Sequence, residues 1–221
     1  MRTYFPLCAA LCLAPVLAAG QAFPPPEEAA RLGEPREAFP VQPLLLAGLG
    51  YTAPLGFGGK GENIAGAFDA GKAMHAAVGL RFGGFGVAGL LRQATPGVAK
   101  SACPGGDCSA KATQKGLMLL AAPAADSGSA FMIGLGYWRD HAKFLGPGGG
   151  TLRELEGWGL FEYAALDFKL GGYGSHFALG GHFIFGIDNF TSSTTAAGKT
   201  SIGVDANQPF WFELGIHGRI L

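Results

Sequence analysis

Apolar residues alternate with small or polar residues at a period of two along much of this chain, and this alternation constrains the fold most strongly. In the segment 73–82, Met74 and Val78 share one side of an extended chain, whereas His75 and Arg81 share the other. Successive side chains of a strand point to opposite faces, so the pattern predicts β-strands with one apolar face. Three further segments alternate as clearly: 129–139, 175–187 and 209–221.

Eight strands are predicted when these segments are combined with neighbouring stretches rich in aromatic residues and glycine. Two of them, 44–53 and 115–122, alternate weakly. In 154–170 the alternation changes phase near Ala164–Asp167, which predicts a β-bulge or the end of the strand. The predicted strands are 44–53, 73–82, 85–93, 115–122, 129–139, 154–170, 175–187 and 209–221.

The composition favours a membrane barrel over a soluble β-sandwich. Only 14% of the residues are charged, and no segment beyond the N-terminal region has the roughly 18 consecutive apolar residues of a spanning helix. The less apolar strand faces carry Gly and Ala with single charges of both signs, which suits the crowded interior of a narrow barrel. We therefore predict an all-β fold, a closed antiparallel up-and-down transmembrane β-barrel of about eight strands.

The connections between the predicted strands alternate between long and short. Three connections are short, namely Gly83–Gly84, 123–128 and 171–174, whereas the other four are long. Outer-membrane barrels have short periplasmic turns and long extracellular loops, so this order predicts a periplasmic N-terminus and four extracellular loops. The long joins are 54–72, 94–114, 140–153 and 188–208.

The N-terminal region predicts export. Residues 1–22 read as a signal peptide, with Arg2 before a short apolar run and small residues suited to cleavage after Gly20 or Ala22. Residues 23–43 are rich in proline and read as an N-terminal tail, for which a disordered leader and a periplasmic plug or tether both remain open. The barrel is expected to occupy 44–221.

Two cysteines remain beyond the predicted signal peptide. Cys103 and Cys108 flank a turn-forming Pro-Gly-Gly-Asp insert. In an oxidising compartment this spacing favours a disulfide that shapes a loop tip. Half of a zinc site is the alternative, although zinc needs about four ligands and no histidine lies nearby in the sequence.

This pattern resembles the small eight-stranded outer-membrane barrels of the OmpA-transmembrane, OmpX and OmpW type. The resemblance is one of architecture over 44–221, without a diagnostic motif. The terminal strand from Phe210 resembles a barrel-assembly signal, although its apolar face ends at Ile220, one residue early. The resemblance implies residence in the bacterial outer membrane, with membrane lipid, lipopolysaccharide and the barrel-assembly machinery as partners.

The lumen of an eight-stranded barrel holds side chains, or at most one small ligand. The polar residues predicted to face inward are expected to form a salt-bridged, hydrogen-bonded network. No metal or cofactor is predicted, because His176 and His182 would lie about 20 Å apart along one strand. His182 would still meet His217 or Glu213 across a strand pair. The predicted lumen residues are His75, Arg81, Glu154, Glu156, Glu162, His176, His182, Glu213, His217 and Arg219.

The predicted function is a structural or surface-binding role through the long extracellular loops. Formal net charge is zero, so no nucleic-acid partner is expected. Enzymatic activity is not predicted, since the adjacent Ser175 and His176 would point to opposite faces of a strand and form no dyad. Three alternatives remain open: a narrow barrel that binds or passes a small apolar ligand, a lipid A-modifying enzyme, and a soluble lipocalin-like barrel.

Overall fold

The computed structural model describes residues 41–103, 105–122, 129–171 and 177–220. Within these residues the chain consists of nine strands and one short 3₁₀ helix, η2 (Ala65–Ala67). The strands are β1 (Val41–Gly58), β2 (Phe68–Phe82), β3 (Phe85–Val98), β4 (Ser109–Ala121), β5 (Ser129–Leu145), β6 (Thr151–Lys169), β7 (Phe177–Thr195), β8 (Gly198–Ser201) and β9 (Asn207–Ile220).

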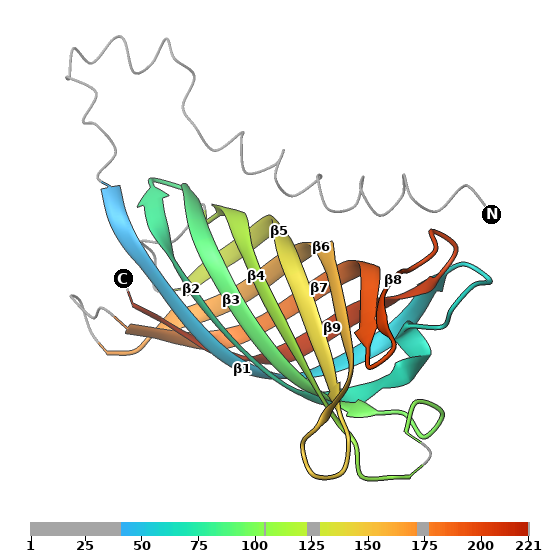
Figure 1. The fold of residues 1–221 in the computed structure, drawn as a ribbon. Coiled ribbons are helices and arrows are strands. Elements are labelled where there is room, and N and C mark those ends of the chain that lie inside the picture. The colour runs from blue at the N-terminus through green and yellow to red at the C-terminus, as the bar shows by residue number, and fades with distance from the viewer. Residues whose placement is uncertain (1–40, 104, 123–128, 172–176, 221) are drawn as a thin grey trace, which may run out of the picture. The chain divides into compact units, whose positions relative to one another are not determined.

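Eight of these strands form a closed ring (Figure 1). β1 to β7 pair in sequence order, each antiparallel to the next, and β9 closes the ring by pairing with both β7 and β1. The short β8 lies outside the ring as a hairpin extension of β7. The predicted up-and-down barrel of eight antiparallel strands is confirmed.

Each predicted strand is present, and most run further than predicted at the rim with the long connections. β5 continues beyond Arg139 to Leu145, and β7 continues beyond Ile187 to Thr195. Alternation fades there because beyond the lipid neither face of a strand has to be apolar. At the opposite rim β1 begins at Val41, so Val41–Pro43 belong to the barrel and not to the N-terminal tail.

The rim with the short connections is also the one where the barrel starts and ends. Val41 pairs with Phe82 at the start of the Gly83–Gly84 turn, and Ile220 pairs with Leu45. Gly83 has a positive φ of 59°, a backbone conformation of two-residue turns that residues with a side chain rarely adopt. By the loop rule of outer-membrane barrels this rim is periplasmic.

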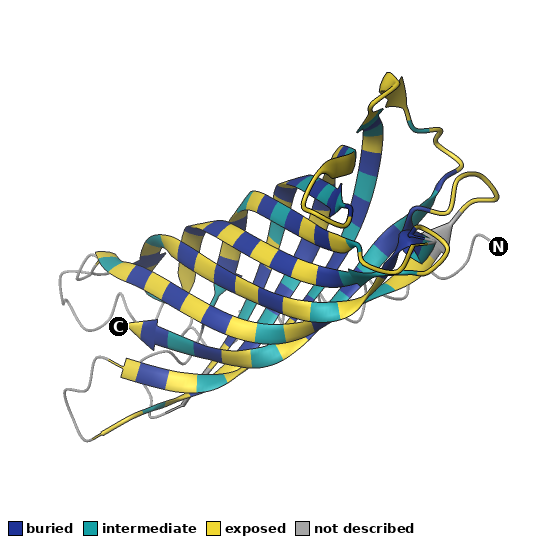
Figure 2. Cartoon of the chain, turned by 60° about the horizontal axis from the view of Figure 1, so that its bottom comes forward, coloured by how far each residue is buried: buried dark blue, intermediate teal, exposed yellow. Residues whose placement is uncertain are grey.

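Buried and exposed residues alternate along the strands, as the checkered ribbon of Figure 2 shows. The outward-facing residues form an apolar band around the barrel. On β9 the band runs from Phe210 to Ile220, about 33 Å of strand, or roughly 23 Å of height at a tilt near 45°. This matches the hydrocarbon thickness that such barrels span. No helix among the described residues is long and apolar enough to cross a membrane.

The predicted phase of β6 was wrong. Leu155, Phe161 and Tyr163 are buried inside the barrel, and the alternation continues without a bulge through Asp167. The register shift of β6 against β7 lies between Glu156 and Gly157 instead. The apparent change of phase arose because the outer face of one strand is charged above the lipid and apolar within it.

The predicted disulfide is confirmed. Cys103 and Cys108 are bonded in the connection between β3 and β4, at the extracellular rim. The bond closes a ring of few residues around the turn, so it shapes the tip of this loop and holds no strands together.

Candidate functional site

A ring of polar side chains crosses the barrel interior. Seven strands contribute one residue each, and all seven side chains are buried. β6 contributes Gly159 instead, where a Cβ atom would come within 2.6 Å of Asp188 Oδ1. The ring consists of Thr52, His75, Arg92, Gln114, Asp140, Asp188 and Glu213.

Arg92 is the only guanidinium of this ring, and its donors are used within it. Its Nε donates to Glu213 Oε2 at 2.6 Å, and its Nη2 donates to Thr52 Oγ1 at 2.8 Å. The guanidinium carbon lies 5.9 Å from the ring centroids of Trp138 and Trp211, within cation–π range. Arg92 therefore links β3 to β1 and β9 through side-chain hydrogen bonds across the lumen.

Asp188 is the second anchor of the ring. It accepts hydrogen bonds from Trp138 Nε1 at 2.6 Å, from Trp211 Nε1, and from Gln114 Nε2 at 3.1 Å. Gln114 in turn accepts a hydrogen bond from Arg92 through its side-chain oxygen. Two buried indoles thus have the polar partner that their N–H groups require.

Glu213 joins the ring to a pair of histidines. Its Oε1 lies 3.3 Å from His75 Nδ1 and 3.0 Å from His182 Nε2, and accepts a hydrogen bond from each nitrogen that carries a proton. The two imidazoles meet edge to face, with ring centroids 4.4 Å apart. All three side chains are fully shielded from solvent.

Apolar layers fill the barrel on both sides of the polar ring. The extracellular layer packs Phe68 against Phe144 and Trp211, with ring centroids 4.9 and 5.3 Å apart. Toward the periplasmic rim the buried apolar residues include Leu44, Leu46, Met118, Leu120 and Met132. The described part of the interior is therefore packed with side chains, as expected for eight strands.

A second polar group lies near the periplasmic rim. Arg219 donates two hydrogen bonds to Asp167, at 2.6 and 3.0 Å, and both side chains are buried. His217 Nε2 lies 3.5 Å from the same carboxylate. Arg81 donates to the side-chain oxygen of Gln42.

The structure places the predicted lumen residues in three groups. Six are buried inside the barrel: His75, Arg81, His182, Glu213, His217 and Arg219. His176 lies outside the described residues, as does Ser175. The remaining three, Glu154, Glu156 and Glu162, face outward.

The inward prediction for these three glutamates was therefore wrong. Glu154 lies on the outer wall, where Lys143 Nζ is 2.8 Å from its carboxylate, and Glu156 pairs with Lys199 at 2.6 Å. Glu162 points outward from the middle of β6, at a half-buried position opposite Leu135 and Phe185. Their inward orientation was predicted on the assumption that charge marks the lumen. This assumption fails for Glu154 and Glu156 because the strand extends beyond the lipid there, and it fails for Glu162 because this carboxylate lies on the lipid-facing wall itself.

Five residues of the polar ring were missed by sequence reasoning. Asp140 and Asp188 lie directly after the predicted ends of their strands, so their parity was not considered. Gln114 lies directly before the predicted strand 115–122, in a segment read as a loop. Arg92 lies on 85–93, which is not among the clearly alternating segments, and Thr52 is the last polar residue of β1. Continuing each predicted strand by two residues would have placed both aspartates on the inner face.

The outer wall of β4 and β5 carries a second candidate site. Lys111 lies directly opposite Lys143 across the strand pair, and Lys115 lies opposite Arg139. We call these four residues the basic patch. Like charges in such positions repel each other. Among the described residues, no carboxylate lies within ion-pair distance of Lys111, Lys115 or Arg139, whereas Glu154 neutralises Lys143.

The basic patch lies at the upper edge of the apolar band. Tyr137, two residues before Arg139 on the same face of β5, stacks on Trp158 of β6 with ring centroids 6.2 Å apart. Tyr51 also faces outward. These three aromatic residues form part of a girdle at the lipid boundary. Tyr163, Trp138 and Trp211 are instead buried inside the barrel, and Tyr173 lies outside the described residues.

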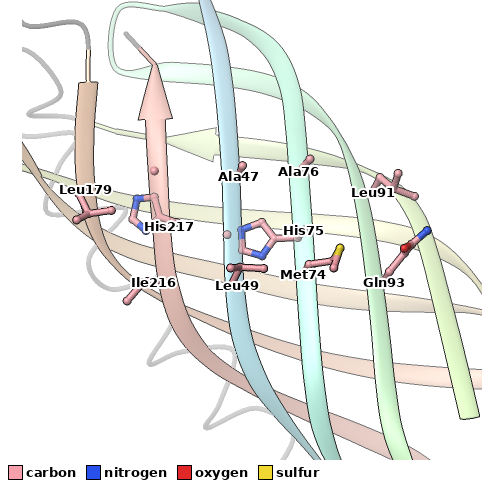
Figure 3. A pocket seen from close by; sticks show the side chains of 12 residues that line it. Ala47, Leu49, Met74, His75, Ala76, Leu91, Gln93, Leu179, Ile216 and His217 are labelled. Carbon is pink, nitrogen blue, oxygen red and sulfur yellow. The ribbon is translucent and has the colours of Figure 1, made fainter. Parts of the chain in front are cut away.

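A depression of about 470 Å³ lies in the barrel wall at β1, β2, β3, β7 and β9 (Figure 3). The depression forms where small residues are surrounded by larger side chains; the small residues are Ala47, Ala76 and Gly218. His75 and His217 contribute to its lining, so the wall between the depression and the interior histidines is thin. The other lining residues are Gly48, Leu49, Met74, Leu91, Gln93, Leu179 and Ile216.

No protein-family model matches the chain, and no curated protein matches it in sequence. Solved structures do match. Neisserial surface protein A (NspA) has a TM-score of 0.57 at 10% identity, over 82% of this chain and 98% of that chain. OprG of Pseudomonas aeruginosa, an outer membrane protein, has a TM-score of 0.55 at 15% identity, over 83% and 97% of the two chains. By its closed ring, its apolar band and these matches, this chain has the fold of the small eight-stranded bacterial outer-membrane β-barrels.

Proposed function

We propose that the protein is a closed outer-membrane barrel with a structural and surface-binding role, and that it binds phosphorylated glycolipid (lipopolysaccharide) of the outer leaflet at the basic patch. The filled interior carries the first part of this proposal. Within the polar ring, Arg92 donates a hydrogen bond to Glu213. Asp188 accepts hydrogen bonds from two indole N–H groups. These bonds connect side chains across the lumen. A conduit would need space along the axis, which eight strands do not supply beside such residues.

Conductance measurements test the closed interior. The protein, refolded in detergent and inserted into planar bilayers, is expected to give no current steps above those of the bare membrane. A general porin in the same lipid is the positive control. Reproducible steps whose size scales with salt concentration would overturn the closed-barrel role.

The basic patch supports the second part. Like charges opposite each other on a strand pair are unfavourable unless an anion lies beside them. Glu154 supplies one to Lys143, whereas Lys115 and Arg139 have none among the described residues. The patch begins directly above Tyr137, and lipid phosphates are expected just beyond an aromatic girdle of this kind. Several phosphate oxygens accept charge-assisted hydrogen bonds from lysine and arginine at once. The extracellular loops and the β7–β8 hairpin extend beyond this level.

A binding experiment separates the patch from charge in general. Nanodiscs holding the wild-type protein are titrated with fluorescent lipopolysaccharide, and binding is compared with the triple variant Lys111→Gln, Lys115→Gln, Arg139→Gln. The matched control replaces three cations elsewhere: Lys60→Gln, Lys72→Gln, Lys100→Gln. We expect the first variant alone to lose at least about tenfold in affinity, since each charge-assisted contact contributes about 1.5–3 kcal/mol. Equal losses in both variants, or unchanged binding of dephosphorylated lipopolysaccharide, would contradict the proposal.

A further inference from the structure

Three potential metal ligands meet inside the barrel. His75, His182 and Glu213 each offer one ligand atom, and these atoms all lie within 4.8 Å of one another. They come from β2, β7 and β9, and all three residues are buried. Two imidazoles and one carboxylate form a donor set that suits Zn²⁺ and other first-row divalent ions.

The distances from the carboxylate of Glu213 to the two imidazoles match those between ligands of a metal centre. Ligands bound tetrahedrally at about 2.0–2.1 Å from zinc lie about 3.3 Å from each other. In the structure Glu213 Oε1 is 3.3 Å from His75 Nδ1 and 3.0 Å from His182 Nε2. Arg92 binds the other carboxylate oxygen, Oε2, at 2.6 Å. It therefore orients the carboxylate while leaving Oε1 for the ion, as outer-shell partners of metal ligands do.

A second observation concerns polar atoms around the same point. His75 Nε2, His182 Nδ1, His217 Nδ1 and the Tyr163 hydroxyl are buried without a hydrogen-bond partner among the described residues, whereas His217 Nε2 lies 3.5 Å from Asp167. The rings of these four residues lie close together. The ring centroid of His182 is 6.1 Å from that of His217 and 6.2 Å from that of Tyr163. Buried polar atoms rarely stay unpaired, so a cluster of them indicates a polar guest.

The charge of the polar ring points to a cation. With neutral imidazoles, the carboxylates of Asp188 and Glu213 face the single guanidinium of Arg92, and Asp140 adds a third carboxyl group that is hydrogen-bonded to Asp188 through a proton held between the two. A buried charge without compensation is costly. A cation beside Glu213 would compensate this excess.

Glycines on neighbouring strands keep room for the three ligands. A Cβ atom at Gly48 would lie 2.4 Å from His75 Cε1, and one at Gly215 would lie 2.6 Å from His182 Cε1. At Gly50 it would lie 2.8 Å from Glu213 Cγ. These glycines of β1 and β9 thus leave the space that the side chains of the three ligands occupy.

We propose that His75, His182 and Glu213 bind one divalent transition-metal ion of the zinc class inside the barrel, with a fourth position for water beside His217 and Tyr163. The ion would link β2, β7 and β9 across the seam where β9 meets β1 and closes the ring. Its role is structural, and it is bound as the barrel folds, because the ligands are enclosed by the wall.

The test is refolding of the tag-free protein in detergent with Zn²⁺ or Co²⁺, followed by passage over a chelating resin. The metal is measured by elemental analysis, and Co²⁺ also by its visible absorption, which reports nitrogen ligands. We expect about one tightly held ion per wild-type barrel. His75→Gln and His182→Gln are expected to lose it, whereas His141→Gln, a change on the outer wall, is expected to keep it.

Each outcome decides the proposal. A folded wild-type barrel that retains no stoichiometric ion would show that protons alone balance the cluster, and would overturn it. Equal retention by His75→Gln, His182→Gln and wild type would place the ion elsewhere and overturn it too. If the two variants fail to fold, the wild-type metal content and the Co²⁺ spectrum still decide.

Discussion

Arg92 carries the only guanidinium of the polar ring, and Glu213 depends on it. Arg92→Leu removes the cation and leaves a buried carboxylate beside two imidazoles. We expect the free energy of unfolding to fall by about 3–5 kcal/mol, the usual cost of breaking a buried ion pair from one side. Urea unfolding in detergent, followed by tryptophan fluorescence, measures it. Arg139→Leu, an exposed cation, is the control and is expected to change stability by less than about 1 kcal/mol.

Glu162 is a carboxylate within the lipid-facing band. Its cross-strand neighbours on the outer wall are Leu135 and Phe185, and no ion pair to it occurs among the described residues. Charge on the lipid face of a barrel is destabilising near mid-membrane. Glu162→Leu is therefore expected to stabilise the barrel by about 1 kcal/mol. Unfolding in lipid vesicles measures this.

Glu156→Leu is the matched control for that change. Glu156 lies on the same face of β6 above the lipid, half exposed and paired with Lys199. Its replacement should leave stability within about 0.5 kcal/mol. A loss of stability in Glu162→Leu would show instead that the glutamate has a favourable partner within the membrane.

Whether a single site residue could be predicted to face inward depended on how clearly its strand alternates. His75, His182 and Glu213 received the correct parity because their strands alternate clearly over the whole band. The sequence also allowed His182 to meet Glu213, since both face inward on strands expected to pair. It could not add His75, because the closing register of the ring decides which residue of β2 faces β9. Arg92 was missed because its strand is not among the clearly alternating ones.

At the scale of elements, the β7–β8 hairpin extends beyond the ring. β8 pairs only with β7, and the ion pair between Lys199 and Glu156 is largely exposed. Replacing 194–201 by a two-residue turn is therefore expected to leave folding unchanged and to shift stability by less than about 1 kcal/mol. The fraction of the variant that folds into detergent micelles, read from gels of unboiled samples, measures this. A variant that no longer folds would show that the hairpin supports the ring.

The number, order and direction of the strands followed from the sequence because lipid imposes alternation on every strand. Their lengths did not follow, since this constraint ends at the headgroups. β5 and β7 continue there through residues such as Lys143 and Ser192, where the outer face is polar. The phase of β6 failed for the same reason, because Glu154 and Glu156 lie above the lipid.

The whole molecule is inverted relative to a soluble β-barrel. Its outer wall exposes Leu49, Val78, Leu117 and Leu214, each more than half exposed, whereas arginines and carboxylates are buried inside. A lipocalin-like cup would bury its apolar side chains and place charges outside. The soluble alternative is therefore contradicted by the distribution of the residues.

This inversion makes a prediction about the intact barrel. A closed barrel with a packed interior should stay folded in SDS at room temperature, because the detergent covers the apolar band and the strands have no free edge. Unboiled protein from a membrane fraction is expected to migrate faster than boiled protein on the same gel. Arg92→Leu, which weakens the interior, should lose the fast band at a lower temperature than wild type, whereas Arg139→Leu should not. Wild-type protein that appears in the aqueous fraction, with identical boiled and unboiled bands, would contradict the membrane barrel itself.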